Sequence, residues 1–161
     1  PTRRSSDLYK MMRNNRALND LKLLSKNDIP ETIKSVEINE DVFGEHFVWL
    51  VGPKDTPFEG GFFKISFVLP NDYPYKPPKM NFVTKVYHPN ISGDGIICID
   101  ILKDQWSAAM RLNTVFLSLS SLLANPNPND PLVPEIANEY ITDREKYNKN
   151  VIAYVKKYAM K

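Results

Sequence analysis

Hydrophobic and polar positions alternate most regularly between residues 62 and 69. The hydrophobic residues that share one face of an extended chain in this stretch are Phe63, Ile65, Phe67 and Leu69. A period of two residues is typical of a β-strand with one buried face. Shorter hydrophobic runs predict three more strands, at Ile33–Ile38, His46–Val51 and Lys79–Thr84. No helix-length segment separates the four strands, so we expect an antiparallel meander.

Helical spacing is found on both sides of the predicted sheet. Before the sheet, possible N-cap oxygens are followed by hydrophobic residues near a helical period. These caps are Ser5, Ser6 and Asp7, and the hydrophobic residues are Leu8, Met11, Leu18 and Leu21. The first helix should end within 27–30, because Pro30 disfavours the α conformation in the residue before it. After the sheet, the hydrophobic stripe of Leu112–Ala124 predicts the most buried helix.

The last predicted helix has a clear start signal. Thr142 and Glu145 have the spacing of a capping box, in which two side groups satisfy free backbone N–H groups. The expected inner face of this helix is formed by Tyr147, Val151, Tyr154, Val155 and Tyr158. The prediction is therefore an α+β fold with an N-terminal helix, a four-stranded antiparallel meander sheet, and then central and C-terminal helices. We expect a single domain over 1–161, in which 1–7 form a flexible N-terminal extension.

Composition narrows the possible functions. The chain of 161 residues contains one cysteine and two histidines, which excludes an internal disulfide and cysteine-rich zinc or iron–sulfur sites. We therefore expect no metal. A net charge of +2 gives no support for a nucleic-acid partner, and no apolar run reaches the length of a membrane span. We expect a monomer in the cytoplasm, the nucleus or both, with no membrane partner.

Cys98 allows two interpretations. Most single cysteines are small buried hydrophobic residues, and Cys98 stands among isoleucines. However, glycines and an aspartate lie just upstream, and a nucleophilic cysteine would have His88 as a nearby base. A cysteine hydrolase therefore stays possible, although the spacing between Cys98 and His88 does not match that of known cysteine hydrolase families. The amide of Asn90 is either a plain turn group or a donor to a developing oxyanion.

Several ordered motifs resemble those of ubiquitin-conjugating enzymes. The active-site signature of that family is similar to His88–Ile91, Gly95–Leu102 and Gln105–Ser107. Further similarity is found at Asp72–Lys79, Asn125–Leu132, Thr142–Tyr147 and Lys157–Met160, the last two being similar to the broad-specificity branch that works with RING and HECT ligases. The resemblance covers roughly residues 8–161 in collinear order. It implies the ubiquitin-conjugating fold.

The resemblance also implies a set of catalytic positions. Cys98 would accept ubiquitin as a thioester from an activating enzyme and pass it to a substrate lysine or a ligase cysteine. Asn90 matches the asparagine that stabilises the tetrahedral oxyanion or holds the loop that does so. Asp130 matches an acidic residue that receives the incoming lysine, and Asp100 matches a second one. His88 matches a residue that supports the turn rather than a base.

Partner surfaces follow from the same resemblance. Pro74, Tyr75 and Lys76 match one ligase-docking loop, and Ser107 and Ala109 match the second. Basic positions for activating-enzyme and ligase binding on the first helix match Arg13 and Arg16, whose alternative is a solvated helix face. Close relatives have proline where this chain has Ala108, so we expect a more flexible second loop.

Three alternatives remain open beside ubiquitin transfer. They are conjugation of another ubiquitin-like modifier, a non-catalytic scaffold that only binds ubiquitin or ligases, and the cysteine hydrolase. The expected partners are ubiquitin, the activating enzyme, RING or HECT ligases and substrate proteins. No cofactor is expected on this chain, because ATP is used upstream by the activating enzyme.

Overall fold

The computed structural model describes residues 2–26 and 28–160, with side chains from residue 14 onward. Its centre is a four-stranded antiparallel sheet in the order β1-β2-β3-β4, which confirms the predicted meander. The strands are β1 (Ile33–Glu37), β2 (Glu45–Val51), β3 (Phe62–Val68) and β4 (Lys79–Phe82). Each strand pairs with the next one along the chain, as expected when short connections join neighbouring strands.

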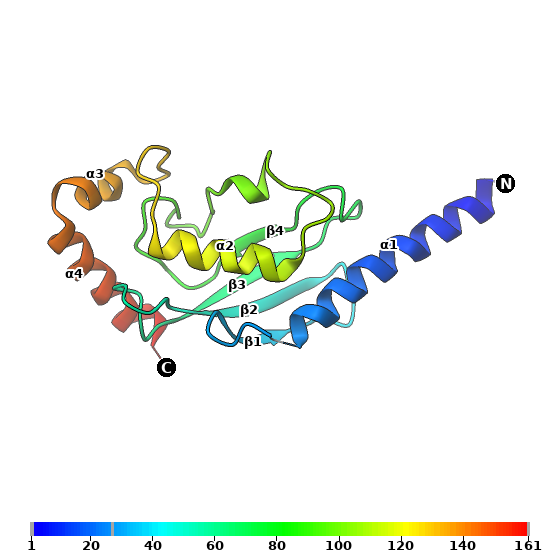
Figure 1. Ribbon diagram of the computed structural model, residues 1–161, viewed down its shortest axis with the longest axis horizontal. Coiled ribbons are helices and arrows are strands. Elements are labelled where there is room, and N and C mark those ends of the chain that lie inside the picture. The colour runs from blue at the N-terminus through cyan, green and yellow to red at the C-terminus, as the bar shows by residue number, and fades with distance from the viewer. Residues whose placement is uncertain (1, 27, 161) are drawn as a thin grey trace.

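One face of the sheet forms the hydrophobic core with helix α2 (Leu112–Ala124). The alternation in β3 places Phe63, Ile65 and Phe67 on the buried side. The ring of Phe67 meets Phe116 of α2 edge-on at 5.5 Å between centroids. Figure 1 shows α2 running across this face of the sheet. The predicted central helix is confirmed with its predicted bounds.

Helix α1 (Thr2–Ser25) is longer than the sequence pattern predicts. It begins at Thr2, ahead of the capping residues proposed at 5–7, and so includes residues 2–7, for which we expected a flexible extension. Its C-terminal half packs on the core through Ala17, Leu21 and Leu24. The N-terminal half extends away from the sheet (Figure 1).

The C-terminal helices differ from the prediction at their junction. Helix α3 (Pro134–Thr142) precedes α4 (Arg144–Tyr154), which continues into a π-helical turn over Val155–Ala159. The predicted capping box is wrong, because Thr142 is the last residue of α3 and its hydroxyl donates to the Asn138 carbonyl at 2.8 Å. Asp143 is the N-cap of α4 instead, and its carboxylate accepts from the Lys146 backbone N–H at 3.2 Å.

The inner face predicted for the last helix is correct only in part. Tyr147, Val151 and Val155 are buried, whereas Tyr154 is exposed and Tyr158 is partly buried. In the described part of the chain, no helix is long and apolar enough to cross a membrane.

Candidate functional site

Cys98 lies in the irregular segment between β4 and α2, just before the short 3-10 helix η1 (Asp100–Leu102). Its side chain is partly exposed, and its backbone N–H donates to the Asn90 carbonyl at 2.9 Å. The thiol donates to Asp130 Oδ2 at 3.5 Å, and Lys103 Nζ donates to the same sulfur, also at 3.5 Å. Cys98 is therefore an accessible sulfur between a carboxylate and an ammonium group, not a core residue.

The groove around Cys98 has a volume of about 660 Å³. It is lined by Cys98, Ile99, Asp100, Lys103, Asp104, Leu122, Asn127 and Asp130. Three of these residues carry carboxylates, so a lysine side chain that enters the groove meets negative charge. Asp100 and Asp130, both predicted from the resemblance, do lie on this groove together with the cysteine. Among the described residues, no cluster of histidine, cysteine and acidic side chains is suited to a metal ion.

Gly95 sets the approach of the chain to Cys98. Its φ of +87° lies in the left-handed region, which glycine adopts without a steric penalty. A Cβ at this position would come within 2.0 Å of the Phe82 carbonyl oxygen. This close approach allows the Phe82 N–H to donate to the Gly95 carbonyl at 2.9 Å, which ties the cysteine-bearing segment to the end of β4.

Asn90 is buried and uses its whole amide to hold the loop that carries Asp130. Its Nδ2 donates to the carbonyls of Asn127 at 2.8 Å and Asp130 at 3.0 Å. Its Oδ1 accepts from the Asn127 N–H at 2.8 Å. Because both amide N–H groups and the amide oxygen have partners, this side chain holds residues 127–130 in place and is not a free donor directed at the sulfur.

His88 is fully buried, and both of its ring nitrogens have partners. Nδ1 accepts from the Asn90 N–H at 3.0 Å, which leaves Nε2 to donate to the Leu122 carbonyl at 2.7 Å. Burial lowers the pKa of His88 to about 4, although the hydrogen bond to Leu122 acts in the opposite direction. A neutral imidazole with no free nitrogen supports the turn and is not the general base that a cysteine hydrolase needs.

The depressed pKa of His88 predicts a pH-dependent stability. Between its unfolded pKa of 6.5 and its folded pKa of about 4, the unfolded chain binds the proton that the folded chain excludes. The free energy of unfolding should therefore fall as the pH is lowered through this range, by about 3 kcal/mol at roughly 1.4 kcal/mol per pH unit. Denaturant titrations from pH 7 to 4 measure the slope.

A His88→Gln variant provides the control, because glutamine does not titrate. Its curve should be flatter than that of the wild type by the His88 contribution; parallel curves would contradict the assignment. NMR titration of the wild-type imidazole is a second test that needs no variant. A ring that becomes protonated near pH 6.5 in the folded protein would show that the burial effect is absent.

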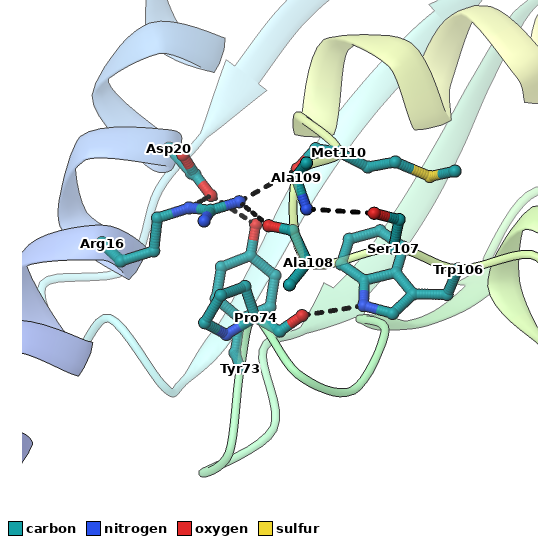
Figure 2. Close-up of polar contacts among 9 residues, drawn as sticks. All are labelled: Arg16, Asp20, Tyr73, Pro74, Trp106, Ser107, Ala108, Ala109 and Met110. Atoms are coloured by element: carbon teal, nitrogen blue, oxygen red, sulfur yellow. Dashed lines mark hydrogen bonds and ion pairs between the residues drawn. The ribbon is translucent and has the colours of Figure 1, made fainter.

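The two proposed docking loops are joined to each other. Tyr75 is a large hydrophobic side chain of the first loop with 68% exposure, Lys76 after it is also exposed, and Pro74 before it is buried. The Trp106 indole N–H donates to the Pro74 carbonyl at 2.8 Å, so the start of the second loop holds the first (Figure 2). Ser107 and Ala109 of the second loop are exposed, and Ser107 Oγ accepts from the Ala109 N–H at 3.2 Å.

Arg16 connects these loops to α1, as Figure 2 shows. Its guanidinium donates to Asp20 Oδ2 at 2.8 Å, and to the carbonyls of Ala108 at 2.6 Å and Met110 at 3.1 Å. Tyr73 completes the network by donating its hydroxyl to Asp20 at 2.6 Å, and burial together with this hydrogen bond raises the pKa of Tyr73. Arg16 is therefore not a solvated residue of a helix face, because it fastens the second docking loop.

The side chain of Arg13, predicted as a partner-binding residue, lies outside the described residues. Lys103 was missed by sequence reasoning, because a lysine five residues after a cysteine follows no helical or strand spacing. The turn η1 brings it back to the sulfur. The residues between Cys98 and Lys103, three of which are hydrophobic, gave no signal for this contact.

Comparisons with known proteins agree with this geometry. Residues 16–155 match the family model described as ubiquitin-conjugating enzyme. The chain is also similar to a solved structure, the E2 domain of a Toxoplasma gondii ubiquitin conjugating enzyme, with 38% sequence identity. This match covers 91% of the present chain and 98% of the other one, with a TM-score of 0.82.

Proposed function

Since this chain belongs to the ubiquitin-conjugating enzyme family, we propose that Cys98 accepts ubiquitin as a thioester from an activating enzyme and transfers it to a substrate lysine or a ligase cysteine. The observation that carries the proposal is the accessible Cys98 sulfur on the acidic groove, 3.5 Å from Asp130. The first step exchanges one thioester for another, so the Cys98 sulfur replaces the sulfur of the activating enzyme. ATP is consumed by that enzyme, and this chain needs no cofactor of its own.

The second step requires a neutral amine at the thioester carbonyl. A free lysine has a pKa of about 10.4, so only about one amine in a few thousand is neutral at pH 7. A carboxylate at the site orients the incoming ammonium group and accepts its proton as the C–N bond forms. Asp130 is suited to this role by its distance to the sulfur. The activated thioester needs no stronger base, which is consistent with a buried, neutral His88.

Asn90 contributes to transfer by holding the loop that presents Asp130. Its three hydrogen bonds to residues 127–130 support this assignment over direct donation to the oxyanion. A carboxylate displaced by about 1 Å loses much of its catalytic effect, because proton transfer depends strongly on geometry. We therefore treat Asn90 as a positioning residue for Asp130.

Work with RING or HECT ligases is the finer part of the proposal. The exposed Tyr75 is a rigid aromatic anchor, since Pro74 precedes it and Pro77 and Pro78 follow it closely. The second loop exposes Ser107 and Ala109, and its backbone is fixed to α1 by Arg16 and to Pro74 by Trp106. A surface fixed before binding loses little conformational entropy when a ligase docks.

A two-stage assay tests the function. The protein is incubated with ATP and matched pairs of activating enzyme and modifier, for ubiquitin and for other ubiquitin-like modifiers side by side. Among the modifiers, we expect only ubiquitin to form a reducible adduct with the protein. When a RING or HECT ligase is added, ubiquitin should pass from this adduct to lysine faster. If only another modifier forms the adduct, the protein is a conjugating enzyme for that ubiquitin-like modifier. If no modifier forms an adduct, the result favours a non-catalytic scaffold that binds ubiquitin or ligases.

A further inference from the structure

Tyr87 comes directly before His88 in the chain, and its hydroxyl group belongs to a polar cluster that the proposed transfer does not use. The hydroxyl donates to Glu139 Oε1 of α3 at 2.7 Å, and Asn150 Nδ2 of α4 donates to the same oxygen at 2.9 Å. Asn150 Nδ2 also donates to the Tyr87 hydroxyl oxygen at 3.3 Å. These three side chains therefore connect α3 and α4 to the segment that leads into Asn90.

The cluster is partly buried, which strengthens its hydrogen bonds. The side chain of Glu139 is only 14% exposed, and its other carboxylate oxygen lies 3.9 Å from Lys146 Nζ. Burial first, and then the hydrogen bond to Glu139, raise the pKa of Tyr87 to about 12, so the hydroxyl keeps its proton at neutral pH. A hydroxyl that donates to a shielded carboxylate forms one of the stronger kinds of hydrogen bond.

The loop that carries Asp130 is held from the same segment of the chain at two points. The first is the amide of Asn90, which holds the backbone of residues 127–130. The second is the Pro89 carbonyl, which accepts from the N–H groups of residues 132 and 133 at 2.9 Å and 3.1 Å. Asp130 lies between these two points, so movement at either one displaces its carboxylate.

Helix α3 begins directly after the second point, and the hydrogen bond between Tyr87 and Glu139 is a third attachment. Hydrophobic packing of α3 is limited, because Ala137 is its only buried residue and Ile141 is 62% exposed. The polar link to Tyr87 therefore has a large share in fixing this helix. Because a hydrogen-bonded helix moves as a rigid unit, a shift at Glu139 is passed on to the residues before Pro134.

We propose that Tyr87 and Glu139 are positioning residues for Asp130: their hydrogen bond fixes α3 and thereby sets the place of the Asp130 carboxylate beside the Cys98 sulfur. This inference rests on the proposed transfer from Cys98. It adds a second hold on the loop to the one that Asn90 supplies. Charging exchanges one thioester for another and needs no proton acceptor for an amine, so the pair acts on the transfer step alone.

Tyr87→Phe is the first test, because it removes only the hydroxyl group. The ring keeps its contacts with Tyr147 and Tyr154, at 6.0 Å and 5.2 Å between centroids. The variant should charge with ubiquitin at the wild-type rate. Its maximal rate of single-turnover discharge to free lysine should fall about tenfold, less than the hundredfold expected for a full 1 Å misplacement.

Glu139 supplies a conservative rescue. Glu139→Ala should slow discharge as much as Tyr87→Phe does, whereas Glu139→Gln should stay within about twofold of the wild type, because an amide oxygen still accepts from the Tyr87 hydroxyl. Tyr154→Phe is the matched control. Its ring contacts Tyr87, but within the described part of the chain its hydroxyl has no hydrogen-bond partner, so its discharge should equal that of the wild type.

A double variant separates positioning from a general structural role. In an Asp130→Ala background, Tyr87→Phe should change the discharge rate by less than about twofold, because the group that the pair positions is absent. A tyrosine that only stabilises the fold would slow discharge by the same factor in both backgrounds.

The outcomes distinguish this inference from the proposed function. Three results would each overturn the positioning role and leave the transferase intact: wild-type discharge in Tyr87→Phe, equal slowing with and without Asp130, or equal loss of charging and discharge. Wild-type discharge in Asp130→Ala alone would also overturn it, because the carboxylate would then have no part in transfer. A wild-type protein that never charges would overturn both proposals.

Discussion

A Cys98→Ser variant is expected to accept ubiquitin as an oxyester that resists reducing agents and is not passed on to a substrate lysine. The serine hydroxyl stands where the sulfur now contacts Asp130. An oxyester is much less reactive toward amines than a thioester, so the second step should be lost while the first is retained. Gel electrophoresis with and without reducing agent distinguishes the two adducts, and transfer to substrate measures the loss.

Cys98→Ala is the matched control, since it removes the nucleophile altogether and should give no adduct. Both variants should unfold at nearly the wild-type temperature, because Cys98 is only partly buried and lies at a groove. The expected change in the free energy of unfolding is within about 1 kcal/mol. An alanine variant that still forms a covalent adduct with ubiquitin would show that another residue is the acceptor.

Asn90→Ala is expected to charge normally and to transfer ubiquitin to lysine about a hundredfold more slowly, which is the size of effect that a misplacement of about 1 Å at the reacting groups produces. The physical reason here is the release of the loop over 127–130, which loses three hydrogen bonds from Asn90. Single-turnover discharge to free lysine measures the rate. Thermal unfolding of the same variant measures the cost of the buried groups left without partners, about 1–3 kcal/mol.

Asn127→Ala separates the two possible roles of Asn90. The Asn127 side chain accepts from the Asn129 N–H at 3.2 Å and stiffens the same loop, whereas Asn90 binds only the backbone of Asn127. If Asn90 acts through the loop, Asn127→Ala should slow discharge to an intermediate rate. Wild-type discharge in Asn127→Ala together with slow discharge in Asn90→Ala would instead favour direct stabilisation of the oxyanion. Equal loss of charging and discharge in Asn90→Ala would indicate a purely structural residue.

The sheet was predictable from the sequence because its pattern is local. Alternation in β3 and the short connections between strands are visible in one pass, and the structure confirms both. Helix α3 escaped prediction because its first residue, Pro134, belongs to a proline-rich stretch that indicates a rigid loop. Proline fits the first turn of a helix as well as a loop, so composition alone does not separate the two.

The sequence motifs predicted which residues belong to the site, but not the hydrogen bonds that hold them. The resemblance singled out Cys98, Asn90 and Asp130, but the hydrogen bonds of Asn90 reach residues 37 and 40 positions away. No local period encodes contacts of that separation. The resemblance singled out Arg16 for partner binding, but its hydrogen bonds to the second docking loop were not predicted, for the same reason. Its alternation with other charged residues is typical of a solvated face, and only the folded chain brings the 108–110 loop onto its guanidinium.

The hydrogen bonds between Arg16 and the second docking loop have a consequence for substitutions in that loop. Its guanidinium holds the carbonyl oxygens of Ala108 and Met110, which are atoms that every residue type possesses. The shape of the loop is thereby separated from the identity of its side chains. Under the proposed docking role, substitutions at 107–109 would change the side chains offered to a ligase while the two carbonyl contacts to Arg16 stay available. Such an arrangement lets recognition diverge between related chains on an inherited scaffold.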